Sequence, residues 1–286
     1  MKMSKFGIIF LVIAGIFLFP FAKVSGVPKE EVVVLTDSNT VVLTGVIEGE
    51  SVAKVIVKVK ELNQLHFVGS KPIYLFLNTP GGEIQTGLEM LEALHGSKRP
   101  VNTVTLFAAS MGFQTVQNLG ERLILKNGVM MSHRAAGRFE GYFGGPFPSQ
   151  VEGRYRFWLS RLDGMDKQTV SRTNGKQTLE SYQKAYADEL WLTGGQSVNG
   201  GYSDRVVTAR CDSSLDGVTT HSLDFLGVQI SYDLDNCPLN TSPMNIHAMA
   251  PSNEKSKFTL SQLQEIKDKF LKQYVESQHA VVPYYQ

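Results

Sequence analysis

The segment KPIYLFLNTPGGEIQTGLEMLEALHGSKRPVNTVTLFAASMG, residues 71–112, contains two apolar runs, 71–78 and 101–107, that are typical of buried strands. A sharp Pro-Gly-Gly turn follows the first run. The apolar residues of 84–94 then recur at the spacing of an amphipathic helix that ends at Gly96. The AASMG segment, 108–112, is expected to start a second helix that reaches Leu119. Strand, crossover helix and strand in this order predict an α/β fold with largely parallel pairing.

The flanking segments extend this pattern. Residues 31–45 predict two strands around a turn, and 51–62 favours a helix over a strand because glutamates precede it and lysines populate its far end. Further strands are expected at 122–125, 129–132 and 205–210. Helices are expected from a Ser149/Glu152 capping box to about Leu162, and from Thr178 to Leu190.

The C-terminal region has a different composition. Residues 239–257 are rich in Pro, Ser and Asn, as linkers are. Thr259 with Gln262 forms a capping box, and Phe258 can staple onto Leu263. The final helix carries an apolar stripe that must cover the core, a neighbouring subunit or another protein, formed by Leu260, Leu263, Ile266, Phe270 and Tyr274. We therefore divide the chain into 1–26, a main domain at 27–238, and a linker with an amphipathic helix at 239–286.

Residues 1–26 resemble a secretory signal peptide. A short basic start precedes 6–22, which contain no charged residue, and the small residues 24–26 offer a cleavage site. An uncleaved membrane anchor is the alternative, because about 17 apolar residues lie at the lower limit of a bilayer span. Either reading predicts an exported protein, in the periplasm or at the extracytoplasmic face of the membrane.

Composition and charge exclude several classes of protein. With 42% apolar and 19% charged residues the chain can bury a sizeable core, which excludes disorder as its main state. The 28 basic residues nearly balance 27 acidic ones and form no basic stripe, so no nucleic-acid partner is expected. No G-x-x-x-x-G-K-[ST] loop is present, so the chain is not its own ATPase, and we expect no cofactor and no metal site.

The two cysteines, Cys211 and Cys237, are expected to form a disulfide in an oxidising compartment. Closing a loop of about 25 residues contributes on the order of 3 kcal/mol in the chain-entropy model. Two buried thiols are the alternative.

Three features of the α/β unit suggest acyl-transfer chemistry. Ser110 lies between a buried strand and the start of a helix, among small neighbours that let its hydroxyl project; an ordinary N-cap serine is the alternative. An amide of the turn at Gly81 and Gly82, together with that of Met111, would form an oxyanion hole. His133 ends a short apolar strand, a position suited to a general base.

Four blocks of sequence carry a family resemblance: TGVIEGESVA at 44–53, KPIYLFLNTPGG at 71–82, AASMG at 108–112 and NGVMMSH at 127–133. In order and spacing, over residues 40–210, they resemble the Clp protease proteolytic subunit family. That family belongs to the Clp/crotonase superfamily, with signal peptide peptidase A. The resemblance implies an α/β fold of the ββα superhelix type with a handle insertion, followed here by a C-terminal helical extension. It also implies a serine endopeptidase with Ser110 as nucleophile, His133 as base, and the amides of Gly82 and Met111 as oxyanion donors.

The resemblance also implies an acid as the third member of a triad. The frame Glu189-Leu-Trp191, followed by Gly201-Tyr-Ser-Asp204, places Glu189 where the family has aspartate, with Asp188 as the fallback. We expect a peptide or protein substrate and a homo-oligomer. An ATP-driven unfoldase partner is not carried over, because no ATP supply exists outside the cytoplasm.

Other functions remain open from the sequence. A Ser–Lys dyad, with Lys126 or Lys167 as base, would resemble signal peptide peptidase A. A chain that keeps the fold only for binding or assembly is the alternative from a different class. A crotonase-type acyl-CoA enzyme is disfavoured because that chemistry has no role for a serine nucleophile.

Overall fold

A computed structural model describes residues 31–65, 71–137, 147–250 and 258–279. The N-terminal segment 1–26, with its predicted signal or anchor, lies outside these residues. Among the described residues, no helix has the length and apolar character needed to cross a bilayer.

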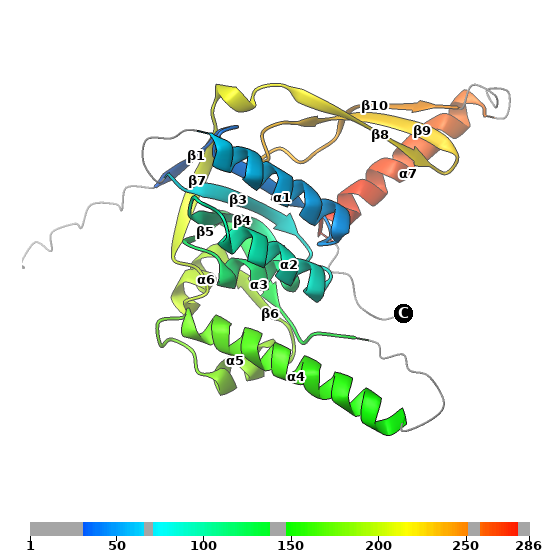
Figure 1. The fold of residues 1–286 in the computed structure, drawn as a ribbon. Helices are drawn as coiled ribbons and strands as arrows, with labels where there is room; N and C mark the ends of the chain where they lie inside the picture. The colour runs from blue at the N-terminus through cyan, green and yellow to red at the C-terminus, as the bar shows by residue number, and fades with distance from the viewer. Residues whose placement is uncertain (1–30, 66–70, 138–146, 251–257, 280–286) are drawn as a thin grey trace, which may run out of the picture. The chain divides into compact units, whose positions relative to one another are not determined.

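A mostly parallel sheet forms the centre of the fold (Figure 1). Its strand order is β1-β7-β5-β4-β3-β2, and β6 pairs with β5 on a separate branch as the antiparallel exception. The strands are β1 Val32–Leu35, β2 Thr40–Thr44, β3 Ile73–Thr79, β4 Val101–Ala109, β5 Arg122–Ser132, β6 Leu190–Thr193 and β7 Arg205–Cys211. Parallel pairing of β2, β3, β4 and β5 in chain order confirms the α/β class predicted from the sequence.

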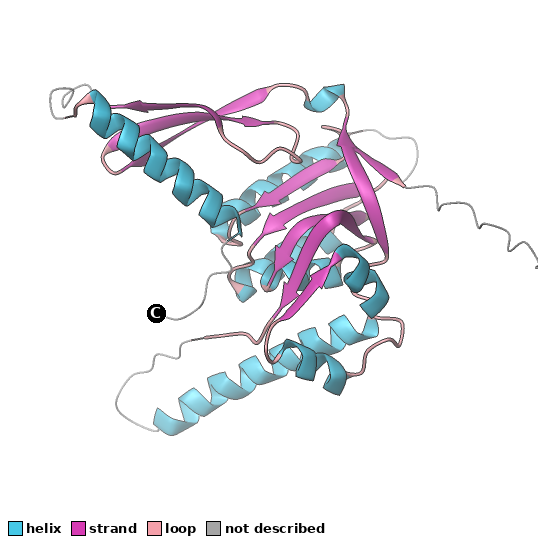
Figure 2. Cartoon of the chain, turned by 180° about the vertical axis from the view of Figure 1, so that it is seen from behind, coloured by secondary structure: helices cyan, strands magenta, loops and turns pink. Residues whose placement is uncertain are grey.

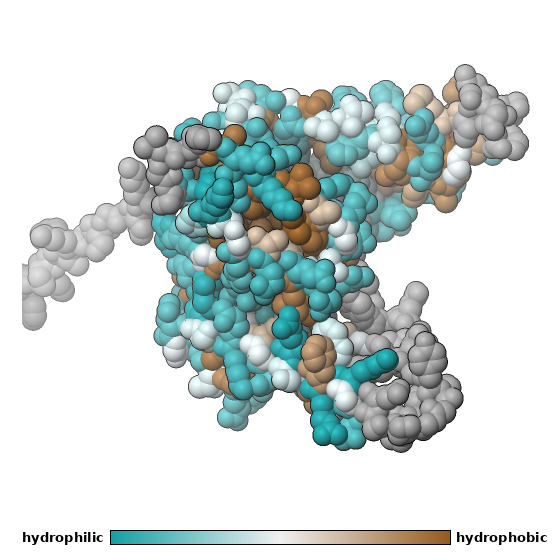
Figure 3. Space-filling view, in the orientation of Figure 1, coloured by the Kyte–Doolittle hydropathy of each residue, from teal (hydrophilic) through white to brown (hydrophobic). Residues whose placement is uncertain are grey.

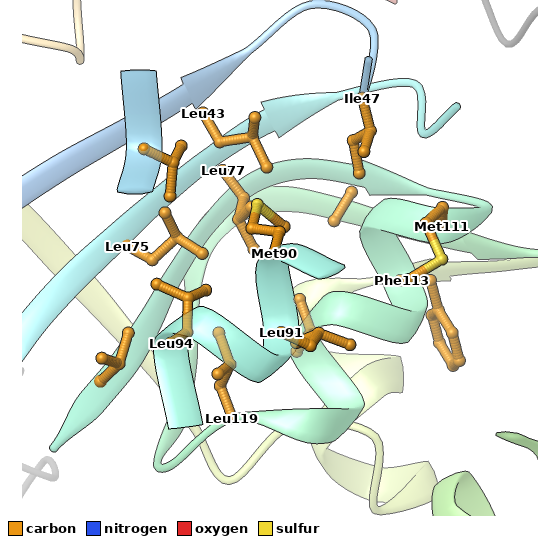
Figure 4. Packing of buried hydrophobic residues seen from close by; sticks show 14 of the residues in the cluster. Leu43, Ile47, Leu75, Leu77, Met90, Leu91, Leu94, Met111, Phe113 and Leu119 are labelled. Atoms are coloured by element: carbon orange, nitrogen blue, oxygen red, sulfur yellow. The ribbon is translucent and has the colours of Figure 1, made fainter. Parts of the chain in front are cut away.

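Helices α1 Gly49–Gln64, α2 Ile84–His95 and α3 Met111–Asn118 connect these strands and match the helices predicted there. Their apolar faces pack against the sheet in one buried cluster (Figure 4). Leu77 of β3, Met90 and Leu91 of α2, and Met111 and Phe113 of α3 are all members of it. The cluster fixes the ends of β3 and β4, where the Pro-Gly-Gly turn and Ser110 lie.

The segment between β5 and β7 differs from the prediction. The strands expected at 122–125 and 129–132 are one strand, β5, with a register shift against β4 between Thr105 and Phe107. Helix α4, Phe147–Ser171, begins before Ser149 and continues beyond Leu162, so it is longer than predicted at both ends, and the side chain of Ser149 lies outside the described residues. Helix α5, Leu179–Tyr186, begins after its N-cap Thr178, close to the predicted start, but ends before Leu190, which begins β6. Helix α6, Gly194–Gly200, then leads to β7.

Residues beyond β7 form a second, antiparallel sheet of order β10-β9-β8 after a short 3₁₀ turn, Ser213–Leu215. Its strands are β8 Val218–Phe225, β9 Val228–Asp235 and β10 Met244–Met249, so a strand lies within the linker-like composition. Helix α7, Leu260–His279, packs on this sheet (Figure 2), with Phe270 buried against Tyr232. The capping box of Thr259 and Gln262 is present as predicted.

The apolar stripe of α7 therefore covers a sheet of its own chain. Leu263, Ile266, Phe270 and Tyr274 pack there, whereas Leu260 is 87% exposed. Cys211, the last residue of β7, and Cys237, which follows β9, form the predicted disulfide.

Candidate active site

Ser110 forms the turn between β4 and α3 in a conformation that few residues other than glycine adopt, with φ 54° and ψ −120°. Two backbone hydrogen bonds hold it there: its N–H donates to the Met131 carbonyl (2.9 Å), and its own carbonyl accepts from the Gln114 N–H (3.1 Å). The side chain makes no capping hydrogen bond to α3, so the ordinary N-cap interpretation does not describe it. A strained strand-to-helix turn with a free hydroxyl is the geometry of a nucleophile elbow.

The Pro-Gly-Gly turn after β3 lies directly against Ser110. A Cβ atom added to Gly81, whose φ is +93°, would come within 2.7 Å of the Ser110 Cβ and 2.9 Å of the Met111 backbone nitrogen. Only glycine permits this approach, because the left-handed φ and the missing side chain are both needed. The turn and the first amide of α3 therefore share one small space.

Two backbone N–H groups beside this space are open to a ligand. Ile47 forms a parallel β-bridge with Gly82. The Ile47 N–H donates to the Gly81 carbonyl (2.7 Å), and the Ile47 carbonyl accepts from the Glu83 N–H (3.0 Å). The bridge thus leaves the Gly82 N–H unused. The Met111 N–H begins a helix and has no acceptor within it. These are the two oxyanion donors named from the sequence.

His133 directly follows β5 and leaves the sheet at the same edge as Ser110. The β4–β5 ladder ends with Ala109 paired to Met131, so the two strands deliver both residues side by side. The Nε2 atom of His133 is buried and has no hydrogen-bond partner among the described residues. Burial lowers the pKa of His133 below its ordinary value of 6.5, although the charge of Glu189 acts to raise it. A neutral imidazole is the form that accepts a proton.

Glu189 lies at the same end of the β5–β6 ladder as His133. The antiparallel ladder ends at the pair of Ser132 and Leu190, so His133 and Glu189 are the next residues beyond it. Glu189 has a left-handed backbone, φ 67°, and its Oε2 accepts a hydrogen bond from Trp191 Nε1 (3.0 Å). In the described part of the chain this carboxylate bonds Trp191 and not His133. Asp188, the fallback, is exposed beside it.

Tyr182 is a buried residue that the sequence did not indicate, and it contacts both elements that carry the proposed catalytic residues. Tyr182 on α5 is fully buried, and its hydroxyl lies 2.8 Å from Ser132 Oγ, next to His133, and 3.4 Å from Gln114 Nε2, on the helix after Ser110. Its ring stacks on Phe113. Burial raises the pKa of Tyr182 to about 12, so it remains a neutral hydrogen-bonding group. The one signal in the sequence was the aromatic pair Tyr182 and Tyr186 on one face of a short helix.

The two lysines considered as alternative bases are placed differently. Lys167 lies on α4, where its Nζ pairs with Asp163 (2.6 Å). Lys126 is exposed within β5, seven residues before His133. Unlike His133, neither lies where a strand of the sheet ends beside Ser110.

Comparison with known proteins relates the chain to one family. The family model of Clp protease matches residues 29–210. The ATP-dependent Clp protease proteolytic subunits of Streptococcus pyogenes serotype M5 (strain Manfredo), Streptococcus pneumoniae (strain Hungary19A-6) and Streptococcus equi subsp. equi (strain 4047) are each 26% identical over 176 residues, which is 60% of this chain and 86% of theirs. A Ser110 elbow beside His133, on a parallel sheet matched along its length by this model, supports a peptidase. The chain belongs to the Clp protease family.

Proposed function

We propose that the protein is a serine endopeptidase that hydrolyses peptide bonds through an acyl-enzyme. Ser110 Oγ attacks the peptide carbonyl carbon while His133 Nε2 takes the hydroxyl proton. The imidazolium then gives that proton to the leaving amine as the C–N bond breaks. Water, deprotonated by the same nitrogen, hydrolyses the ester and regenerates the Ser110 hydroxyl.

The strained turn at Ser110 is the observation that carries this proposal. A serine that served only to cap a helix would use its hydroxyl on that helix, and Ser110 does not. Its left-handed backbone costs on the order of 1–3 kcal/mol, which a purely structural turn could avoid with glycine. The unpartnered Nε2 of His133 supplies the matching acceptor at the same edge of the sheet.

The backbone amides of Gly82 and Met111 stabilise the tetrahedral oxyanion in this mechanism. Both are fixed before substrate binds, Gly82 by the bridge to Ile47 and Met111 by α3, so neither has to reorganise as charge develops. Glu189 is the third member of the triad and offsets the charge of the imidazolium.

The names of the relatives and the surface of the chain bear on its substrate, assembly and location. The relatives are named proteolytic subunits of an ATP-dependent protease, which favours protein or peptide substrates and a homo-oligomer for this chain. Hydrophobic side chains gather near α1 and α2 on an otherwise mainly hydrophilic face (Figure 3), and Val57 of α1 is 54% exposed, as an assembling surface would require. We propose that the protein is exported, as the apolar segment 6–22 and the disulfide suggest, and that it works without an ATP-driven unfoldase.

Labelling of the purified chain with a fluorophosphonate probe tests the mechanism. We expect labelling that is lost in both Ser110→Ala and His133→Ala and retained in Ser160→Ala, an exposed serine on α4. Retention of labelling in His133→Ala would favour the Ser–Lys dyad. No labelling of the folded wild-type chain across several pH values would favour a non-catalytic module. Fractionation of the producing cells tests export. The mass of the mature chain then distinguishes a cleaved signal from an uncleaved anchor.

A further inference from the structure

Glu189 has a geometric problem as a triad acid. It carries one more methylene group than aspartate and therefore one more torsion to restrain, and its side chain is exposed. Its backbone lies in the left-handed region, where β6 has not yet begun. A carboxylate that orients an imidazole has to be held in one place, because a misplacement of about 1 Å can cost 10²-fold in rate.

The β5–β6 ladder places one side chain where it can provide that restraint. Met131 pairs with Trp191, and the ladder ends one pair farther, at Ser132 and Leu190, so His133 and Glu189 are the next residues beyond its end. Glu189 and His133 lie just outside the paired residues, but the Trp191 and Glu189 side chains meet and the charge of Glu189 acts on His133, so the three side chains lie close together. The indole N–H already donates to Glu189 Oε2 at 3.0 Å.

We propose that Trp191 is a positioning residue: its indole N–H holds Oε2 of Glu189 and leaves Oε1 to accept from Nδ1 of His133. This inference rests on the proposed triad and adds the group that makes a glutamate usable in it. An indole donates and cannot accept, so it can hold a carboxylate oxygen and cannot compete for the imidazole proton. The other charged groups close in sequence, Asp188 and Arg134, are exposed.

Trp191→Phe keeps an aromatic ring and removes the donor. We expect a fall of about 10-fold in the maximal rate of fluorophosphonate labelling, with the concentration for half-maximal rate unchanged, as loss of one hydrogen bond to a charged group predicts. The acid limb of the pH–rate profile moves to lower pH, because a less well-held carboxylate raises the pKa of His133 less. Trp158→Phe, which alters the other of the chain's two tryptophans, is the matched control and leaves both quantities unchanged.

Fluorescence tests the contact without relying on activity. In the Trp158→Phe background Trp191 is the single tryptophan, and Glu189→Ala shifts its emission whereas Asp188→Ala does not. Thermal unfolding of each variant confirms that it folds.

Three outcomes overturn the inference. The labelling rate of Trp191→Phe equals that of the control, or it exceeds that of the wild type, or the emission of Trp191 does not change in Glu189→Ala. A rate above wild type would mean that Trp191 holds the acid away from His133. If the wild-type chain is not labelled at all, the triad and the role of Trp191 fall together, and the fluorescence still decides whether the two side chains touch.

Discussion

His133 and Glu189 lie at one end of the β5–β6 ladder, each adjacent in sequence to a member of its last pair, Ser132 and Leu190. An antiparallel strand thereby brings residue 189 to the edge where the parallel strands β4 and β5 deliver Ser110 and His133. The backbone ladder thus brings the residues of the proposed base and acid to one edge of the sheet.

The pH dependence follows from the environment of His133. Burial lowers its pKa, so the imidazole is neutral at pH 7 and becomes protonated only below its ordinary value of 6.5. We expect the labelling rate to be constant above pH 7 and to fall as the pH drops through that lowered pKa. Glu189→Gln removes the charge that raises the pKa and moves the fall to still lower pH. It also reduces the plateau, by up to about 10⁴-fold if the amide acts as it does in other triads. A pH–rate profile with its midpoint well above 6.5 would contradict this assignment.

Substitution of Gly81 tests the close approach of its turn to Ser110. The Cβ of Gly81→Ala would meet the Ala109 carbonyl oxygen at 2.5 Å, in a backbone conformation that alanine disfavours. We expect a stability loss of at least about 1–3 kcal/mol and a labelling rate lower by about 10²-fold. Gly164→Ala, in helix α4 with open space around it, is the matched control and leaves labelling unchanged. Equal behaviour of the two variants in thermal unfolding and labelling would refute the tight packing of the turn.

The Tyr182 hydroxyl links the strand that carries His133 to the helix that follows Ser110. Tyr182→Phe removes its bonds to Ser132 and Gln114, and we expect a loss of about 1 kcal/mol in stability together with slower labelling. Ser132→Ala breaks the 2.8 Å contact from the other side. The double variant should therefore lose less than the two single variants added together in denaturant unfolding. Full additivity would show that the contact is not formed.

Local pattern was sufficient for the part of the fold that carries Ser110. The apolar runs of β3 and β4 and the periodicity of α2 fixed those elements within two residues, because their burial is dictated by their own sequence. Strand β5 was split in the prediction at Lys126-Asn127-Gly128. There Gly128 lies so near the neighbouring strand that a Cβ would meet the Thr105 carbonyl at 2.6 Å, a non-local contact.

Elements defined by distant partners were not predictable. The sequence of β6 resembles a continuation of the helix before it. It forms a strand because Glu189 has a left-handed backbone, which ends the helical path, and because β6 then pairs with β5. Strand β8 is exposed along nearly its whole length, so it shows no apolar alternation to reveal it. For the same reason the sequence indicated Ser110, His133 and Glu189 but neither the Trp191 bond nor the role of Tyr182, since both depend on which strands and helices meet.

An ion pair with a buried arginine holds the far end of β5. Arg122 is 2% exposed and Asp204 31%, and the guanidinium bonds Asp204 through Nη2 at 2.5 Å and Nε at 3.2 Å. Its Nη1 donates to Gln117 and the Gly201 carbonyl, and Nη2 also donates to the Arg172 carbonyl. Asp204→Ala leaves this guanidinium without its counter-charge, so we expect a loss of about 3–5 kcal/mol in the free energy of unfolding.

The same pair has a pH signature. Burial acts to raise the pKa of Asp204, but the hydrogen bonds and charge of Arg122 outweigh it and lower that pKa. The contribution of the Arg122–Asp204 pair to the free energy of unfolding is therefore present above the ordinary aspartate pKa of about 3.9, and it is lost as the pH falls through the lowered pKa of Asp204. Asp37→Ala, which breaks an exposed pair with Lys58, should change stability by no more than about 0.5 kcal/mol. Similar losses in the two variants at pH 7 would argue against a special role for Arg122.

The Cys211–Cys237 disulfide joins the last strand of the family-matched sheet to the C-terminal sheet that lies outside the match. Cys211→Ala/Cys237→Ala opens a loop whose ends are 26 residues apart, and we expect a loss of about 3 kcal/mol in stability. The reduced wild-type chain should unfold at nearly the same temperature as this double variant. Addition of reductant should not change the unfolding temperature of the double variant. Because Ser110 and His133 depend on β4 and β5, whose ladder the disulfide does not touch, labelling at 25 °C should persist in the reduced chain. Loss of labelling on reduction, with the double variant inactive as well, would mean that the C-terminal sheet contributes to the active site.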